Sequence, residues 1–277
     1  MIAGDRLYPI RRPLAAMCAG ACVAVLGGLV GLGGAEFRLP VLIAVFALYA
    51  HRAIRINLLI SLATLAMSAV ARLSFLHSVN VGDFKMEIAG MLAGGIIAAW
   101  FGAGYLKRIP KTRIMGVIAV VLLATAVLLV AETLLHGVAW AALAADSQWR
   151  WMAAIFAGLL VGTISSLLGV AGGEFIIPIL IFVFGADIRT AGTASVLISI
   201  PVVLTGVGRH WLTGHYRSQS MLIYVVLPMA VGSALGAMVG GYFAAWAPTD
   251  ALRLLLSAIL AVSALKLWTN SGPEKSN

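Results

Sequence analysis

Apolar residues run along this chain in long blocks, separated by short polar or glycine-rich breaks. Within a block, Leu, Val, Ile, Ala and Gly follow one another without the alternation of a half-buried strand. The pattern therefore predicts helices and not a β-barrel. Most blocks have about 20 residues, the length of a membrane-spanning helix. The predicted helical segments cover, approximately, 14–33, 37–50, 56–76, 88–106, 114–135, 150–168, 175–186, 191–208, 221–243 and 251–268.

Two of these segments are too short to cross a bilayer alone. As helices, 37–50 and 175–186 would extend about 21 and 18 Å, against a hydrocarbon core of about 30 Å. Each follows a glycine-rich break. We therefore predict that each forms a glycine-broken hairpin with the helix before it.

The second half of the chain repeats the first at a constant offset. GLGGAEFRLP at 31–40 aligns with GVAGGEFIIP at 169–178, an offset of 138 residues. The offset also relates Leu42/Leu180, Ala53/Ala191, Ser61/Ser199, Gly94/Gly232, Gly102/Gly240 and Pro110/Pro248. Such a duplication is typical of secondary transporters. It predicts a tail at 1–13, membrane repeat 1 at 14–136, a loop at 137–149, membrane repeat 2 at 150–269 and a tail at 270–277.

The amino-acid composition narrows the class of protein further. Of the 277 residues, 62% are hydrophobic and 10% are charged, whereas soluble domains carry about 25% charged residues. This excludes a soluble globular protein, a disordered chain and a nucleic-acid-binding module, despite the net charge of +9. The prediction is an all-α polytopic membrane protein with about eight to ten membrane helical segments. No enzyme activity, catalytic residue, metal or cofactor is expected.

The positions of the Lys and Arg residues favour one arrangement of the chain across the membrane. If each short segment returns to its starting side, most Lys and Arg fall on the cytoplasmic side, where such residues are enriched. These include Arg6, Arg11, Arg12, Arg52, Arg55, Lys107, Arg108, Lys111, Arg113, Arg209, Arg217, Lys266 and Lys275. Each half then makes an odd number of crossings. The two repeats are therefore predicted to be inverted, with both chain ends in the cytoplasm.

The doubled glycine–proline motif resembles the signature of the sulfite exporter TauE/SafE family, also called the toluene-sulfonate uptake permease family. In that family an Ala-x-x-Thr-Ser-like segment follows the motif. Here 191–195 reads AGTAS, while 53–57 reads AIRIN and departs at the Thr and Ser positions. The resemblance implies a multi-pass carrier of the bacterial inner membrane. It also implies sulfur-containing anions as substrates: sulfite, sulfonates, sulfoacetate or thiosulfate.

The glycine breaks are candidate anion sites. Backbone groups freed within the membrane are tolerated where they are buried in protein or line a wet cavity. Helix N-termini offer N–H donors and partial positive charge, which suit an oxyanion. The alternative is that the glycines allow tight hairpin packing. The substrate-binding candidates at these breaks are Gly33, Gly34, Ala35, Gly172 and Gly173.

Glu36 and Glu174 follow the two breaks. An ionised acid within an apolar bundle costs about 2.5 kcal/mol or more, so such an acid suggests function. A carboxylate repels an anion, whereas the protonated acid donates a hydrogen bond. We therefore predict that both acids couple anion movement to proton movement. The alternative is that each Glu caps its short helix or pairs with an arginine.

Further polar residues are substrate-binding candidates. Asn57, Ser61, Thr193, Ser195 and Ser199 could donate hydrogen bonds to an oxyanion, or could instead join helices. Arg38 lies two residues after Glu36 and suits bidentate oxyanion contact. Three other cations are predicted to be interface anchors at helix ends: Arg72, Arg209 and His210.

A stripe of small residues recurs in both halves. Gly94, Ala98 and Gly102 align with Gly232, Gly236 and Gly240. This spacing permits close helix approach. It predicts packing between the two halves or in a homodimer.

The sequence thus predicts a secondary transporter that moves a small sulfur-containing anion by alternating access, with protons and the lipid bilayer as its other partners. An anion channel is the first alternative. A cation carrier that uses the two glutamates as ligands is the second.

Overall fold

The computed structural model describes residues 13–46, 48–76, 79–105, 111–135, 149–168, 170–212 and 221–270. These residues form α-helices, joined by a 3₁₀ turn at Val81–Phe84 and a π-helical turn at Leu222–Val226. The α-helices are α1 (Pro13–Val30), α2 (Ala35–Ala44), α3 (Ala50–Phe75), α4 (Lys85–Tyr105), α5 (Lys111–Leu135), α6 (Trp149–Leu168), α7 (Gly173–Phe182), α8 (Ile188–Leu212), α10 (Leu227–Trp246) and α11 (Thr249–Asn270). The predicted all-α class is confirmed. The two predicted tails and the inter-repeat loop lie almost entirely outside the described residues.

Several stretches are long and apolar enough to cross a membrane. By length and composition these are Pro13–Val30, Arg52–Phe75, Val81–Phe101, Ile188–Leu212 and Leu222–Trp246. They confirm a multi-pass membrane protein.

The two short helices differ from their predicted bounds of 37–50 and 175–186, and they end earlier, at Ala44 and Phe182. Both α2 and α7 have ten residues, which is about 15 Å of helix. Each begins two residues earlier than predicted, because it starts directly after a left-handed glycine: Gly34 with φ 69° and Gly172 with φ 81°. Glu36 and Glu174 therefore lie in the first turn of these helices.

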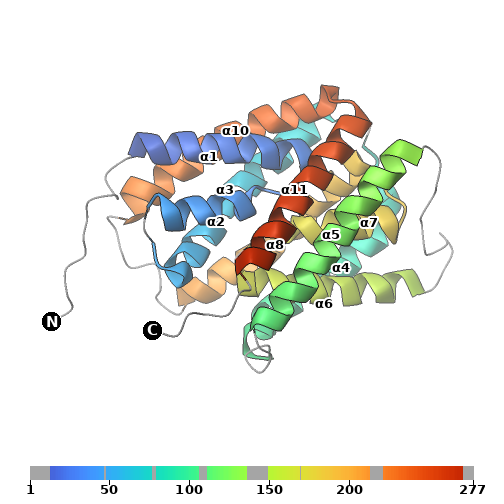
Figure 1. The fold of residues 1–277 in the computed structure, drawn as a ribbon, viewed down its shortest axis with the longest axis horizontal. Coiled ribbons are helices and arrows are strands. Elements are labelled where there is room, and N and C mark those ends of the chain that lie inside the picture. The colour runs from blue at the N-terminus through green and yellow to red at the C-terminus, as the bar shows by residue number, and fades with distance from the viewer. Residues whose placement is uncertain are drawn as a thin grey trace.

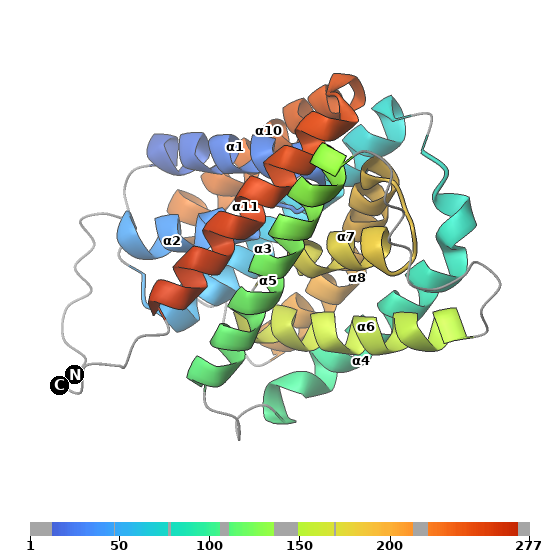
Figure 2. The same cartoon turned by 45° about the vertical axis from the view of Figure 1, so that its right-hand side comes forward.

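The helices of the two halves pack reciprocally. At the offset of 138 residues, α1 corresponds to α6 and α4 to α10. In the structure α1 packs along α10, and α4 packs along α6. Each pair joins the two halves, and exchanging every helix for its counterpart turns one pair into the other. In Figures 1 and 2, α1 runs from left to right and α6 runs from right to left. This arrangement is consistent with the predicted inverted repeats.

The small residues lie where these helices meet. A β-carbon on Gly232 would come 2.0 Å from the carbonyl oxygen of Met17, and one on Gly236 would come 2.2 Å from that of Ala21. In the other pairing, a β-carbon on Gly94 would lie 2.2 Å from the carbonyl oxygen of Ile155. The stripe therefore packs the two halves against each other, the first of its two predicted roles.

This packing predicts a clear effect on stability. In Gly158→Ala, the β-carbon would come 2.2 Å from the carbonyl oxygen of Met91. Backbone cannot move aside as a flexible side chain can, so we expect a loss of about 1–3 kcal/mol and a lower Tm in detergent. Gly116→Ala is the matched control, because its β-carbon meets nothing within 4 Å and alanine favours helix by up to about 1 kcal/mol. Equal Tm values for the two variants would contradict the close approach.

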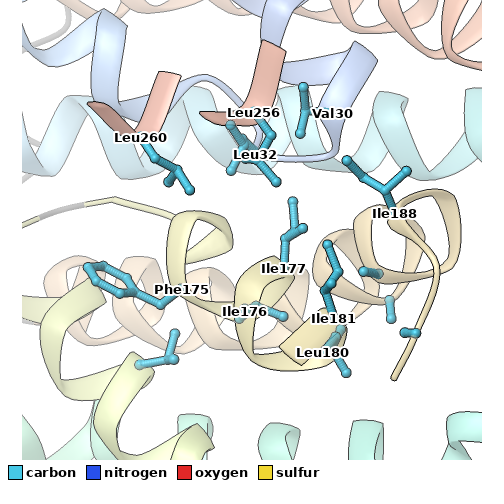
Figure 3. Packing of buried hydrophobic residues seen from close by; sticks show 14 of the residues in the cluster. Val30, Leu32, Phe175, Ile176, Ile177, Leu180, Ile181, Ile188, Leu256 and Leu260 are labelled. Carbon is cyan, nitrogen blue, oxygen red and sulfur yellow. The ribbon is translucent and has the colours of Figure 1, made fainter. Parts of the chain in front are cut away.

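Apolar side chains from both halves meet around the first glycine break. In Figure 3, Leu32 lies beside Leu256 of α11, and Ile177 of α7 faces them. All three side chains are buried. This cluster packs the middle of α7 against the break of the first half.

Candidate functional site

The two glycine breaks contact each other at the centre of the molecule. Gly31 and Gly33 have φ values of 95° and 79°, which L side chains rarely adopt. A β-carbon on Gly31 would lie 2.4 Å from the carbonyl oxygen of Gly192, and one on Gly173 would lie 3.0 Å from Cα of Leu32. Glycine is therefore required both for the turn and for the close approach of the two halves.

Both short helices begin at this interface. In both views α2 extends to the left and α7 to the right (Figures 1 and 2). Their N-cap residues are glycines without a capping side chain. In α7 the carbonyl of the cap, Gly172, accepts from the N–H groups of Phe175 and Ile176. Pro40 and Pro178 lie inside these helices, where each removes one further backbone hydrogen bond. The interface therefore offers two helix N-termini with their partial positive charge.

Arg38 of α2 is fully buried, at 0% exposure. Its Nη1 donates to Ser61 Oγ at 3.1 Å and to Asn57 Oδ1 at 3.5 Å. Its Nη2 donates to Thr64 Oγ1 at 2.9 Å and to the Gly33 carbonyl at 3.2 Å. All four acceptors are neutral, and Nε–H has no acceptor among the described residues. The guanidinium thus brings a buried positive charge and a spare donor to the break.

Arg150 shows how the charge of a poorly exposed arginine is usually neutralised. Arg150 at the start of α6 forms an ion pair with Glu87 of α4, with 2.6 Å between Nε and Oε1. It also donates to the Phe184 carbonyl at 3.3 Å. Buried charges are normally paired in this way. The neutral surroundings of Arg38 therefore distinguish a candidate binding group from a structural ion pair.

The prediction that Arg72 is an interface anchor is wrong. The residue is 1% exposed and its side chain turns into the protein. Its Nη2 donates to the carbonyls of Gly28 and Leu29 at 3.0 and 2.8 Å, and its Nη1 donates to Thr193 Oγ1 at 3.3 Å. The carbonyls at the end of α1 have no partners within their helix, so they attract the cation inward. Arg209 and His210, in contrast, do lie in the last turn of α8.

The contacts of Arg38 and Arg72 reveal a polar stripe along α3. Its members follow at spacings of three or four residues, which places them on one helix face. All are buried: Asn57, Ser61, Thr64, Ser68 and Arg72. Our sequence analysis identified the first two and overlooked Thr64 and Ser68, although the same spacing would have found them.

The candidates of the second half lie on α8 and at the start of α7. Thr193 contacts Arg72, as described above. Ser195 and Ser199 are buried, and their hydroxyl groups have no partner among the described residues. A β-carbon on Gly173 would lie 3.0 Å from Ser195 Oγ, so this hydroxyl faces the start of α7.

The two halves are not chemically equivalent. The counterpart of Arg38 is Ile176, which is buried in the apolar core. In the first half, Asn57 Nδ2 donates to the Ala35 carbonyl at 2.8 Å. The two buried arginines of the site, Arg38 and Arg72, are therefore both supplied by the first half.

The two acids lie in similar positions. Glu174 is buried, at 3% exposure. Glu36 is half-buried, and its Oε2 accepts a hydrogen bond from Ser263 of α11 at 3.1 Å. Each acid is the second residue of its helix, α2 or α7. Both helices have their N-terminus at the interface of the two halves. The structure thus brings Gly33, Ala35, Arg38, Asn57 and Ser61 into one cluster. It brings Gly173 and Ser195 together, and it places Thr193 against Arg72.

Comparison with known proteins identifies relatives for nearly the whole chain. The sequence model of the family described as "Sulfite exporter TauE/SafE" matches residues 16–270. The chain is 26% identical to "Probable membrane transporter protein YdhB" of Bacillus subtilis (strain 168), over 88% of this chain and 95% of the relative. It is 32% identical to "Probable membrane transporter protein y4hK" of Sinorhizobium fredii (strain NBRC 101917 / NGR234), over 42% of this chain and 45% of the relative.

No solved structure matches the chain. The family match spans both repeats and both glycine breaks, and the two relatives are named as membrane transporters. The chain belongs to the sulfite exporter TauE/SafE family of membrane transporters.

Proposed function

We propose that this protein is a secondary carrier that moves a small sulfur-containing oxyanion, such as sulfite or an organosulfonate, across the bacterial inner membrane. It works by alternating access and couples anion movement to protons. Both chain ends lie in the cytoplasm. The family supports a permease or exporter role; the anion is argued from the residues at the break.

The observation that carries the proposal is the buried, unneutralised charge of Arg38. A buried cation without a carboxylate is costly, and neutral hydroxyls recover part of that cost. An oxyanion next to Nε–H would supply the missing negative charge. The N-terminus of α2 adds partial positive charge at the same place. Because Nη1 and Nη2 each donate to two protein acceptors, the Nε–H is the donor left for one oxygen of sulfite or a sulfonate.

The burial of both arginines supports alternating access. Arg38 and Arg72 are 0% and 1% exposed, so neither side of the membrane has direct access to them. A closed centre between two reciprocally packed halves is what an occluded carrier requires. An open channel would instead keep a continuous wet path.

The same charges argue against a cation carrier. A cation that entered the break would meet two guanidinium groups and two helix N-termini, all of which repel it. The glutamates instead suit a proton-coupling role, because a protonated acid beside the anion removes repulsion and adds a donor.

The proposal is tested by uptake of radiolabelled sulfite and a small sulfonate into proteoliposomes. We expect saturable uptake, counterflow against unlabelled anion, and accumulation when a pH gradient is imposed. Uptake that never saturates and shows no counterflow would indicate a channel. If neither anion is transported, the proposed substrate class is wrong.

A further inference from the structure

Arg72 is the second buried cation, and the site around Arg38 does not explain it. Three of its five N–H groups are used, on two carbonyls at the end of α1 and on Thr193. Its Nε–H has no acceptor among the described residues. The guanidinium also lies against α8, since a β-carbon on Gly192 would come 2.9 Å from its Nη1.

Two unpartnered hydroxyls lie next to Arg72. Ser195 is one helical turn from Gly192 on the same face of α8, which is about 5–6 Å. It is 0% exposed, and its Oγ faces the first residue of α7. Ser68 lies midway along α3 between Thr64 and Arg72, about 6 Å from each by helical rise. Its hydroxyl is also fully buried without a partner.

We infer that Arg72 forms a second anion-binding position, together with Ser195 and the N-terminus of α7, and that Ser68 joins this position to Arg38. The inference rests on the proposed anion transport. The same small oxyanion occupies the two positions in turn. Arg38 contacts residues toward the beginning of α3, whereas Arg72 lies in its last turn. The second position therefore serves the membrane side on which α3 ends.

The competing explanation is that Arg72 is a cap for the end of α1. Its contacts with the Gly28 and Leu29 carbonyls are of that kind. A cap accounts for Nη2. It does not account for the free Nε–H, or for the unpartnered hydroxyls of Ser68 and Ser195.

The test compares the two sides of the membrane. Sulfite uptake is measured in right-side-out and inside-out vesicles for the wild type, Arg72→Lys, Ser195→Ala and Ser68→Ala, with Ser74→Ala as the control. Ser74 is on the same helix but exposed. The side on which α3 ends is assigned by labelling Ser74→Cys with an impermeant maleimide, in a background that lacks Cys18 and Cys22.

We expect Arg72→Lys to raise the KM for entry from the side of Ser74 by about tenfold, because lysine keeps the charge but loses the planar fork. The KM from the other side should change by less than about twofold. Ser195→Ala should raise the KM for entry from the side of Ser74 severalfold. This variant replaces Arg72→Lys as the test if Arg72→Lys does not fold. Ser68→Ala should lower the maximal rate without changing either KM, while Ser74→Ala should behave as wild type.

Four outcomes would overturn the inference. Equal KM changes on both sides would mean that the anion has one shared site. A lower Tm with unchanged KM values would mean that Arg72 is a helix cap. If the wild type shows no saturable sulfite uptake, the proposed function fails and this inference fails with it, whereas normal wild-type uptake with unaffected variants removes the second position alone.

Discussion

Replacing Arg38 by methionine is expected to lower the affinity for sulfite by about one to two orders of magnitude and to leave the protein folded. The substitution removes a buried charge and its spare Nε–H donor, which we place against the oxyanion. Hydrogen bonds to charged groups contribute about 1.5–3 kcal/mol, which corresponds to a loss of about tenfold to 150-fold in the affinity for the transported anion. Stability should fall by about 1–3 kcal/mol, because the buried acceptors on Asn57, Ser61, Thr64 and Gly33 lose their donor. Removal of the buried charge offsets part of this cost.

Ile176→Met is the matched control for Arg38→Met. It introduces the same side chain at the corresponding position of the second half, where the native residue is already apolar. A volume-conserving apolar exchange costs less than about 1.5 kcal/mol, so uptake should remain normal. Uptake in proteoliposomes and Tm in detergent are measured for both variants. A folded Arg38→Met protein with the sulfite KM and rate of the wild type would contradict the assignment of Arg38.

The helices and the glycine breaks could be predicted from the sequence because their causes are local. Long apolar runs specify membrane helices, and Gly31, Gly33, Gly34 and Gly172 specify turns with positive φ. The grouping of Asn57 and Ser61 followed from their spacing on one helix face. Most residues of the cluster around Arg38 could therefore be predicted from the sequence.

Contacts between distant segments could not be predicted in this way. Arg72 bonds to Leu29 and Thr193, which are 43 and 121 residues away. Its position in the last turn of a helix is typical of an interface anchor, and local sequence does not reveal that the end of α1 faces it. The bond of Ser263 to Glu36 spans 227 residues and depends on where α11 crosses the first half.

The glutamates supply the second large expected effect. In Glu36→Gln and Glu174→Gln, we expect proton-driven accumulation of sulfite to disappear while exchange of labelled for unlabelled sulfite continues. Glutamine keeps the shape and an oxygen acceptor, for example for Ser263 at position 36, but it cannot bind or release a proton. One pH unit across the membrane supplies about 1.4 kcal/mol per proton, or about tenfold accumulation of anion at one proton per cycle. The variants should reach a ratio near one.

The measurement is the steady-state ratio of internal to external sulfite at an imposed pH difference, together with the rate of counterflow. Asp83→Asn is the control, because this acid is exposed and lies away from the breaks; it should accumulate sulfite as the wild type does. Counterflow matters because it needs no driving force, so a variant that has lost only coupling retains it. A variant that loses both activities would instead indicate that the acid supports the short helix. Accumulation that persists in both glutamine variants would show that proton coupling, if present, does not depend on Glu36 or Glu174.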